Sequence, residues 1–251
     1  MPTNKNILTI TCNNMRKLAL YPLSLLYGLA IWVRNLFFDL GILQTQHISG
    51  KSICIGNLNV GGTGKSPHVG YLIELLSPLV QVQVLSRGYG RKTKGFIALS
   101  TNSTAAHVGD EPQMLFNQYQ DKAQFAVCEK RSIGIDRLRK EQPASLILLD
   151  DAFQHRYVKA GLNIVLSVYD QPVHEDYLIP AGRLREPISG LKRADAIVIT
   201  KCPKFETFDL NELKKPYQKW QIPVFFSRYT YHALQSKGKI LEQINEVFIV
   251  S

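Results

Sequence analysis

The chain has 251 residues, enough for one large domain or two small ones with a packed core. It carries 30 Lys and Arg against 20 Asp and Glu, and this net charge of +10 favours an anionic partner such as a phosphorylated substrate or an anionic membrane surface. The basic residues are dispersed and form no nucleic-acid-binding module, so we expect no nucleic-acid partner. The four cysteines lie far apart, which argues against a zinc site.

The N-terminal part contains an uncharged, apolar segment at residues 18–33. As a helix it would be about 24 Å long, shorter than a comfortable membrane span. Arg16 and Lys17 precede it and Trp32 lies near its far end, a pattern typical of a helix at the membrane surface. We therefore expect residues 1–45 to form a membrane-associating helical segment on the cytoplasmic side. The alternative is a helix that packs on the protein's own core.

In residues 46–251, short apolar β-branched runs alternate with helical patterns. Such alternation predicts the α/β class, with a mostly parallel sheet covered by helices on both faces, as in P-loop NTPases. The expected helices cover residues 67–76, 111–120 and 132–140. The expected strands cover residues 52–55, 82–85, 96–99, 125–128, 145–149, 163–168, 196–200, 224–226 and 246–251.

A glycine-rich turn, Gly-Gly-Thr-Gly-Lys-Ser, follows the first expected strand and precedes the first expected helix. Turns of this kind hold phosphate oxygens with backbone N–H groups, while the Lys reaches the β- and γ-phosphates and the Ser hydroxyl ligates Mg²⁺. Asn59 stands where the general pattern has Gly, and we expect it to tolerate a positive φ there. The alternative is a chance glycine-rich turn. The expected nucleotide-binding residues are Asn59, Val60, Gly61, Gly62, Thr63, Gly64, Lys65 and Ser66.

Two adjacent carboxylates, Asp150 and Asp151, end the apolar strand expected at residues 145–149. Open α/β sheets bind ligands at the carboxyl ends of their strands, and an Asp there commonly holds the metal beside a phosphate loop. Oxygen ligands linked to phosphate suit Mg²⁺. We expect Asp150 and Asp151 to hold this metal together with Ser66, and the alternative is a turn or a helix N-cap.

Three further places carry charges that phosphoryl transfer could use. Arg87 and Arg91 follow the strand expected at residues 82–85, and Asp110 stands at an expected helix start, where it could also be an N-cap. Residues 180–187, Pro-Ala-Gly-Arg-Leu-Arg-Glu-Pro, form a turn that is either part of the site or a salt-bridged surface loop. The expected catalytic residues are Lys65, Arg87 and Asp110.

Six segments occur in an order that resembles one family, the tetraacyldisaccharide 4'-kinases, which are lipid A 4'-kinases of Gram-negative bacteria. The resemblance runs from the N-terminal helix to the end of the chain. The segments are residues 56–67, 86–91 (Ser-Arg-Gly-Tyr-Gly-Arg), 109–112 (Gly-Asp-Glu-Pro), 150–156 (Asp-Asp-Ala-Phe-Gln-His-Arg), 180–187 and 193–201.

This resemblance implies a kinase on the cytoplasmic face of the bacterial inner membrane that uses Mg-ATP. Its acceptor would be the 4' hydroxyl of a tetraacylated glucosamine disaccharide 1-phosphate, a lipid. By the family's motifs, Lys65 and Ser66 hold ATP phosphates and Mg²⁺, Asp150 and Asp151 bind the metal with Glu186 nearby, and Asp110 is the base for the sugar hydroxyl.

The resemblance also implies a second lobe that follows residue 251 in family members and supplies a His partner to the catalytic Asp. No His in this sequence matches that role. Two alternatives to an active kinase therefore stay open: a catalytically impaired, membrane-bound nucleotide-binding remnant, and a P-loop NTPase that acts as a switch on a protein partner.

Overall fold

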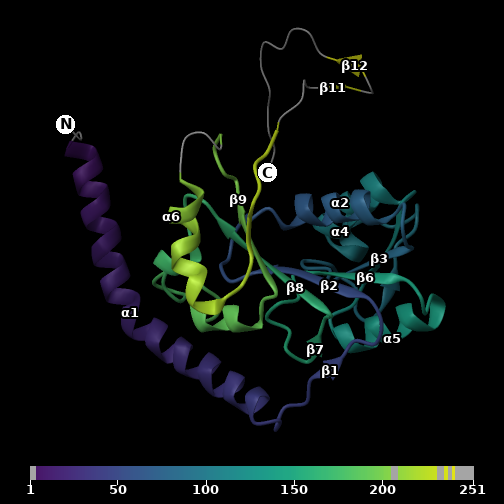
Figure 1. The fold of residues 1–251 in the computed structure, drawn as a ribbon, viewed down its shortest axis with the longest axis horizontal. Coiled ribbons are helices and arrows are strands. Elements are labelled where there is room, and N and C mark those ends of the chain that lie inside the picture. The colour runs from purple at the N-terminus through teal and green to yellow at the C-terminus, as the bar shows by residue number, and fades with distance from the viewer. Residues whose placement is uncertain (1–3, 205–208, 231–234, 237–238, 241–251) are drawn as a thin grey trace.

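The protein is built around one eight-stranded sheet (Figure 1). The computed structural model describes residues 4–204, 209–230, 235–236 and 239–240. The strand order is β10-β9-β8-β2-β6-β3-β5-β4, and every neighbouring pair is parallel except β4 with β5. The strands are β2 Ser52–Asn57, β3 Val82–Ser86, β4 Ile97–Ala98, β5 Ala123–Val127, β6 Leu146–Asp150, β8 Leu162–Val168, β9 Ala196–Thr200 and β10 Val224–Phe226.

Helices cover both faces of this sheet, so its central strands can be apolar on both sides. All five residues of β3 and of β6 are buried. α2 (Lys65–Leu76) and α4 (Asp110–Tyr119) lie on one face, where Ile73 and Leu115 join a core cluster with sheet residues. α5 (Arg131–Glu141) lies on the opposite face (Figure 1) and contributes Ile135 and Leu138 to a second cluster.

Short elements complete the described chain. Two small two-stranded sheets pair β1 with β7 and β11 with β12. These four strands are β1 Gln46–His47, β7 Val158–Lys159, β11 Gln235–Ser236 and β12 Lys239–Ile240. The short helices are α3 Ala105–Val108, α6 Leu210–Lys214, and the 3-10 helices η1 Val173–Glu175, η2 Ile188–Arg193 and η4 Lys215–Trp220.

The N-terminal helix α1 (Asn4–Asp39) runs along one side of the α/β body (Figure 1). It is attached through polar contacts: the Ser24 hydroxyl donates to the Leu178 carbonyl at 2.9 Å, and the Tyr27 hydroxyl donates to the Arg185 carbonyl at 2.6 Å. Near its end, Asp39 forms an ion pair with Arg156 at 2.7 Å. One face of α1 therefore packs on the body at the turn of residues 177–185.

The expected α/β class and the mostly parallel, helix-covered sheet are confirmed. Each expected strand up to residue 226 is present, although the one at residues 96–99 is only Ile97–Ala98 and runs antiparallel at the sheet edge. The helix expected at residues 18–33 is part of the longer α1. The strand expected at residues 246–251 lies outside the described residues.

Candidate functional site

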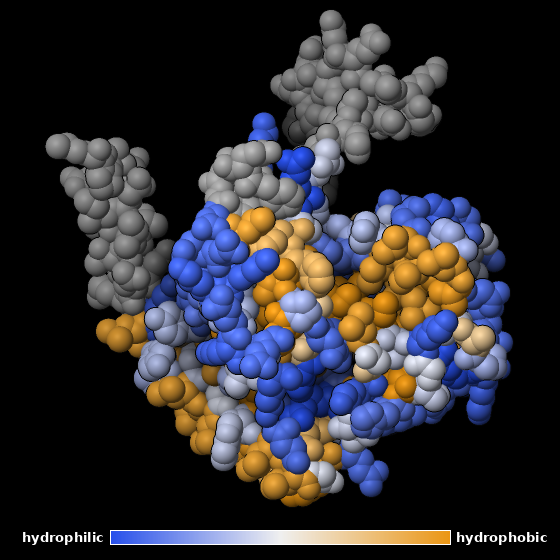
Figure 2. Space-filling view, in the orientation of Figure 1, coloured by the Kyte–Doolittle hydropathy of each residue, from blue (hydrophilic) through white to orange (hydrophobic). Residues whose placement is uncertain are grey.

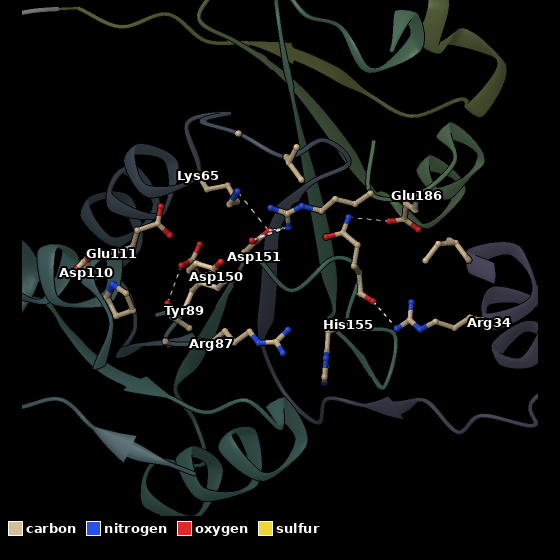
Figure 3. Close-up of a pocket in the computed structure, with 18 of the residues that line it drawn as sticks. Arg34, Lys65, Arg87, Tyr89, Asp110, Glu111, Asp150, Asp151, His155 and Glu186 are labelled. Atoms are coloured by element: carbon tan, nitrogen blue, oxygen red, sulfur yellow. Dashed lines mark hydrogen bonds and ion pairs between the residues drawn. The ribbon is translucent and has the colours of Figure 1, made fainter. Parts of the chain in front are cut away.

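A cavity of about 860 Å³ opens at the carboxyl ends of the central strands. Its lining combines side chains that follow β2, β3 and β6 with side chains from α1 and from residues 180–187 (Figure 3). Eight of the expected site residues line it, namely Val60, Gly61, Lys65, Arg87, Asp110, Asp150, Asp151 and Glu186. The other expected residues, Asn59, Gly62, Thr63, Gly64 and Ser66, belong to the same glycine-rich turn or the first turn of α2 without lining the cavity.

The glycine-rich turn has the conformation of a phosphate cradle. Gly61 (φ 110°) and Gly64 (φ 90°) adopt positive φ, which L-residues with side chains rarely do. A Cβ on Gly61 or Gly62 would meet no atom within 4 Å, so the rim of the turn stays open for phosphate oxygens. The turn forms with Asn59 in place of Gly, as expected, but Asn59 does not need the positive φ that it was expected to tolerate. Asn59 instead pairs with Leu184 in an isolated antiparallel bridge, so extended backbone is favoured there.

The turn at residues 180–187 buttresses this cradle. The Val60 N–H donates to the Arg183 carbonyl at 2.8 Å, and the Arg185 N–H donates to the Leu58 carbonyl at 2.7 Å. Arg183 itself pairs with Asp176 at 3.1 Å, outside the cavity lining. The turn is therefore part of the site architecture, and its two arginines have different partners.

Asp150 ends β6 directly beside β2 and is only 4% exposed. Its Oδ2 accepts a hydrogen bond from the Ser86 hydroxyl at 2.9 Å, whereas its buried Oδ1 has no partner within the described part of the chain. Burial, followed by the charges of Asp151 and Glu111, raises the pKa of Asp150 to about 6 although the Ser86 hydrogen bond acts in the opposite direction. A buried carboxylate oxygen without a partner suits a cation at this position.

Asp151 is shared by two cations. The Arg185 guanidinium contacts both of its carboxylate oxygens at 3.1 and 3.0 Å, and the Lys65 Nζ lies 3.7 Å from Oδ1. Lys65 Nζ also donates to Asn57 Oδ1 at 3.3 Å. Asp151 has a positive φ of 49°, a conformation that Asp tolerates better than most residues. Lys65 and Arg185 are thus held where phosphate oxygens above the cradle would meet them.

Asp110 is the first residue of α4 and is exposed toward the cavity. Gly109 is the N-cap, and no side-chain hydrogen bond caps this helix. The N-cap alternative for Asp110 is therefore wrong. A Cβ on Gly109 would lie 2.8 Å from the Tyr89 carbonyl oxygen, so glycine at this corner lets α4 begin close to the turn after β3.

The two arginines after β3 point to different places. Arg91 forms an ion pair with Glu129 at 2.6 Å and its side chain is 2% exposed, so the expectation that it faces the ligand is wrong. Arg87 lines the cavity, but Figure 3 shows its guanidinium directed toward His155 and not toward Lys65. Its catalytic role stays a prediction.

Glu186 is 3% exposed, and both of its oxygens have protein partners. Arg193 contacts Oε2 at 2.5 Å and the Gln154 amide donates to Oε1 at 3.1 Å. Arg193 in turn stacks on the Phe153 ring, with its guanidinium carbon 4.4 Å from the centroid. The structure gives Glu186 a bracing role at the cavity wall, and its metal role stays a prediction.

The oxygen donors around the cradle fit a small, hard cation. Within the described residues no group of three or more His, Cys, Asp and Glu side chains could hold a metal ion. Mg²⁺ is commonly bound by one or two carboxylates, water and substrate phosphates. Asp150, Asp151 and the Ser66 hydroxyl are the residues that would hold it.

Arg34, Gln154 and His155 line the cavity although the sequence had not singled them out as site residues, whereas Arg185 belongs to the turn at residues 180–187 whose place in the site was left open. His155, Gln154 and Arg185 lie in segments that carried the family resemblance, so that order of motifs was a usable signal. The position of Arg34 in the cavity could not be predicted, because in the sequence Arg34 only follows an apolar helical segment.

The fold and the cradle define the class: this is a P-loop α/β protein. A model of the family described as tetraacyldisaccharide-1-P 4'-kinase, LpxK, matches residues 16–247. The chain belongs to this family.

Relatives and a solved structure agree with that assignment. The tetraacyldisaccharide 4'-kinase of Bacteroides fragilis is 49% identical over 225 residues, covering 86% of this chain and 58% of the relative, and that of Porphyromonas gingivalis is 46% identical over 220 residues, covering 84% and 60%. The crystal structure of Aquifex aeolicus LpxK in complex with ATP superimposes with a TM-score of 0.69 at 28% identity, covering 89% of this chain and 86% of that one. The chain thus spans about three fifths of the length of these two curated relatives.

Proposed function

We propose that this chain binds Mg-ATP and transfers its terminal phosphoryl group to the 4' hydroxyl of a tetraacylated disaccharide 1-phosphate. The observation that carries this proposal is the arrangement at the cradle, where Lys65 and Arg185 converge on Asp151 beside the buried, half-satisfied Asp150. Family membership supports the acceptor, and the ATP complex of the Aquifex aeolicus structure supports the nucleotide.

In this proposal each group of site residues has a separate role in phosphoryl transfer. The glycine-rich turn binds the ATP phosphates, and Lys65 stabilises the charge that develops on the transferred group. Mg²⁺, held by Ser66, Asp150 and Asp151, would supply further neutralisation of the phosphate oxygens. Asp110, exposed at the start of α4, accepts the proton of the attacking hydroxyl, and Arg185 moves from Asp151 to phosphate oxygens when the nucleotide binds.

We further propose that residues 1–45 form the membrane-associating segment and residues 46–251 the kinase domain, with the protein on the cytoplasmic face of the inner membrane. Residues Lys17–Asp39 of α1 are long and apolar enough to cross a membrane by length and composition alone. The side of α1 turned away from the body is apolar, and Figure 2 shows hydrophobic residues along this edge of the molecule. Leu18, Leu25, Leu26, Leu29 and Trp32 are each more than half exposed.

The first experiment measures phosphate transfer to the disaccharide lipid in mixed micelles. Asp110→Asn should slow transfer about 100- to 10,000-fold, because general-base catalysis contributes on that scale, and should leave Mg-ATP affinity unchanged. Asp121→Asn, an exposed carboxylate outside the cavity, is the matched control. Equal loss of transfer and nucleotide affinity in Asp110→Asn would contradict its role as the base.

The same assay separates the alternatives. If the wild-type chain binds Mg-ATP and leaves the lipid unmodified, it is the catalytically impaired remnant. If a protein partner stimulates its nucleotide hydrolysis and lipid has no effect, it is the P-loop switch. The comparisons do not favour the remnant, since both curated relatives above are named as kinases.

The membrane proposal is tested by flotation with vesicles. Leu25→Glu combined with Leu29→Glu should weaken vesicle binding at least about 100-fold, since each buried leucine contributes roughly 1.5–3 kcal/mol. Phe225→Glu, an exposed apolar residue of β10, is the control. Unchanged flotation of the α1 variant would contradict the proposal.

A further inference from the structure

Two hydroxyl groups fix the middle of α1 to the turn that buttresses the cradle. The Ser24 side chain is buried, and its hydroxyl donates to the Leu178 carbonyl and accepts the Ala181 N–H, both at 2.9 Å. One turn of helix further on, a Cβ on Gly28 would lie only 2.7 Å from the Leu178 side chain, so glycine lets α1 lie directly on this turn. The Tyr27 hydroxyl lies between these two positions in the sequence and makes the second connection.

Tyr27 binds the peptide of Arg185, and Arg185 is held at two other places. Its carbonyl accepts the Tyr27 hydroxyl at 2.6 Å, and its N–H donates to the Leu58 carbonyl at 2.7 Å. Its guanidinium contacts both carboxylate oxygens of Asp151 at 3.1 and 3.0 Å. Arg185 therefore connects α1, the chain that enters the cradle and a carboxylate beside it.

The neighbours of Arg185 extend this connection to the start of the cradle. Leu184 forms an antiparallel bridge with Asn59, and the Val60 N–H donates to the Arg183 carbonyl at 2.8 Å. Residues 183–185 thus run along residues 58–60, directly before the first glycine of the cradle. Because these hydrogen bonds join backbone to backbone, a displacement of one segment displaces the other.

We propose that Ser24 and Tyr27 are positioning residues of the nucleotide site. They hold the backbone of Arg185 so that its guanidinium can move from Asp151 to the phosphate oxygens without a search for its position, and they make this site dependent on the docking of α1. The inference rests on the proposed function. It adds that the helix proposed to contact the bilayer also supports nucleotide binding.

Two other roles for these hydroxyl groups predict different results. If they only fasten α1, their removal lowers stability and leaves the Mg-ATP affinity of the folded protein unchanged. If Tyr27, which lines the cavity, contacts only the acceptor, its removal has no effect on Mg-ATP binding when no acceptor is present. Ser24 does not line the cavity, so an effect of Ser24 on nucleotide binding has to pass through the turn.

The test measures Mg-ATP affinity of the full chain by calorimetry without acceptor, and the urea unfolding of each variant. Tyr27→Phe and Ser24→Ala should each weaken Mg-ATP binding about 3- to 10-fold, which is the size of one intramolecular hydrogen bond. Tyr21→Phe, the same change at an exposed position of α1 outside the cavity lining, is the matched control and should keep the affinity.

A double variant tests whether Tyr27 acts through Arg185. Arg185→Met alone should weaken Mg-ATP binding about 10- to 100-fold, because charge-assisted hydrogen bonds to phosphate are lost. Tyr27→Phe added to Arg185→Met should weaken it by no more than a further factor of about two, because residues that act as a unit are not additive.

The proposal is overturned if Tyr27→Phe and Ser24→Ala unfold at lower urea but bind Mg-ATP as the wild type does. It is also overturned if the losses from Tyr27→Phe and Arg185→Met multiply in the double variant. If the affinities behave as expected and no phosphate is transferred to the lipid, the positioning role holds and the proposed activity fails.

Discussion

The two ends of the cavity use positive charge in opposite ways. At the cradle, Lys65 and Arg185 already share Asp151, and Asp150 lies beside them with one unpartnered oxygen. At the far end of the cavity, which we call the basic end, Arg34 and Arg87 form no ion pair within the described chain. Burial, followed by the charges of Arg131, Arg87 and Arg34, lowers the pKa of the neighbouring His155 to about 4.

This difference determines which partners the cations of each end have before and after a ligand binds. Cations that rest on a carboxylate can be transferred to phosphate oxygens when a nucleotide and a metal enter, so the cradle stays neutralised with and without ligand. Cations without a carboxylate partner stay available to anions from solution, so the basic end presents a positive potential to the cavity.

The largest expected effect comes from removing the lysine of the cradle. Lys65→Met keeps the apolar stem and should lower kcat/KM about 100- to 1,000-fold, because the developing charge on the phosphoryl group loses its closest cation. The measurement is lipid phosphorylation at saturating and limiting Mg-ATP, with Lys140→Met as the control outside the cavity. Turnover within threefold of wild type would show that Lys65 does not act at the transferred phosphate.

The second effect is a pH dependence confined to the cradle. The pKa of Asp150 is raised to about 6, so a proton competes with Mg²⁺ below that pH, and apparent Mg²⁺ affinity should fall about 10-fold per pH unit between pH 6 and 5. In the metal-free protein the fold favours protonated Asp150. The free energy of unfolding of the metal-free protein should therefore decrease as pH rises from about 4 to about 6.

Asp150→Asn should remove both dependences, which calorimetry with Mg²⁺ and urea unfolding at several pH values would measure. A wild-type Mg²⁺ affinity that stays flat from pH 7 to pH 5 would mean that Asp150 is not the group that binds the metal.

The parts of this picture that follow the chain locally could be predicted from the sequence. The glycine-rich turn, its lysine and the Asp pair at the end of β6 are each read from a few consecutive residues, and alternating apolar runs predicted the sheet. The carboxyl ends of adjacent parallel strands meet at one edge, so Lys65 and Asp151 were expected to be neighbours, and they are.

Features that depend on which distant segments meet could not be predicted. Asn59 pairs with Leu184 in an isolated antiparallel bridge, and no local sequence pattern indicates that these two residues meet. Arg87 and Arg91 are four residues apart and have the same side chain, yet Glu129 forms an ion pair only with Arg91. Arg34 enters the cavity only because α1 docks against residues 154–156. Local pattern carries no information about these contacts.

The smallest expected effect tests the charge contrast directly through stability. Arg185→Met removes an ion pair in which the Arg185 Nη1 contacts both oxygens of Asp151 and the side chains are 28% and 30% exposed, so the free energy of unfolding should fall by about 0.2–1 kcal/mol. Arg87→Met removes a cation that has no partner and repels Arg131, so stability should be unchanged or slightly higher at low salt. Urea unfolding of both variants at low and high salt measures the difference, which should shrink as salt screens both effects. The reverse ranking, with Arg87→Met the more damaging variant, would mean that the basic end is already neutralised in the free protein.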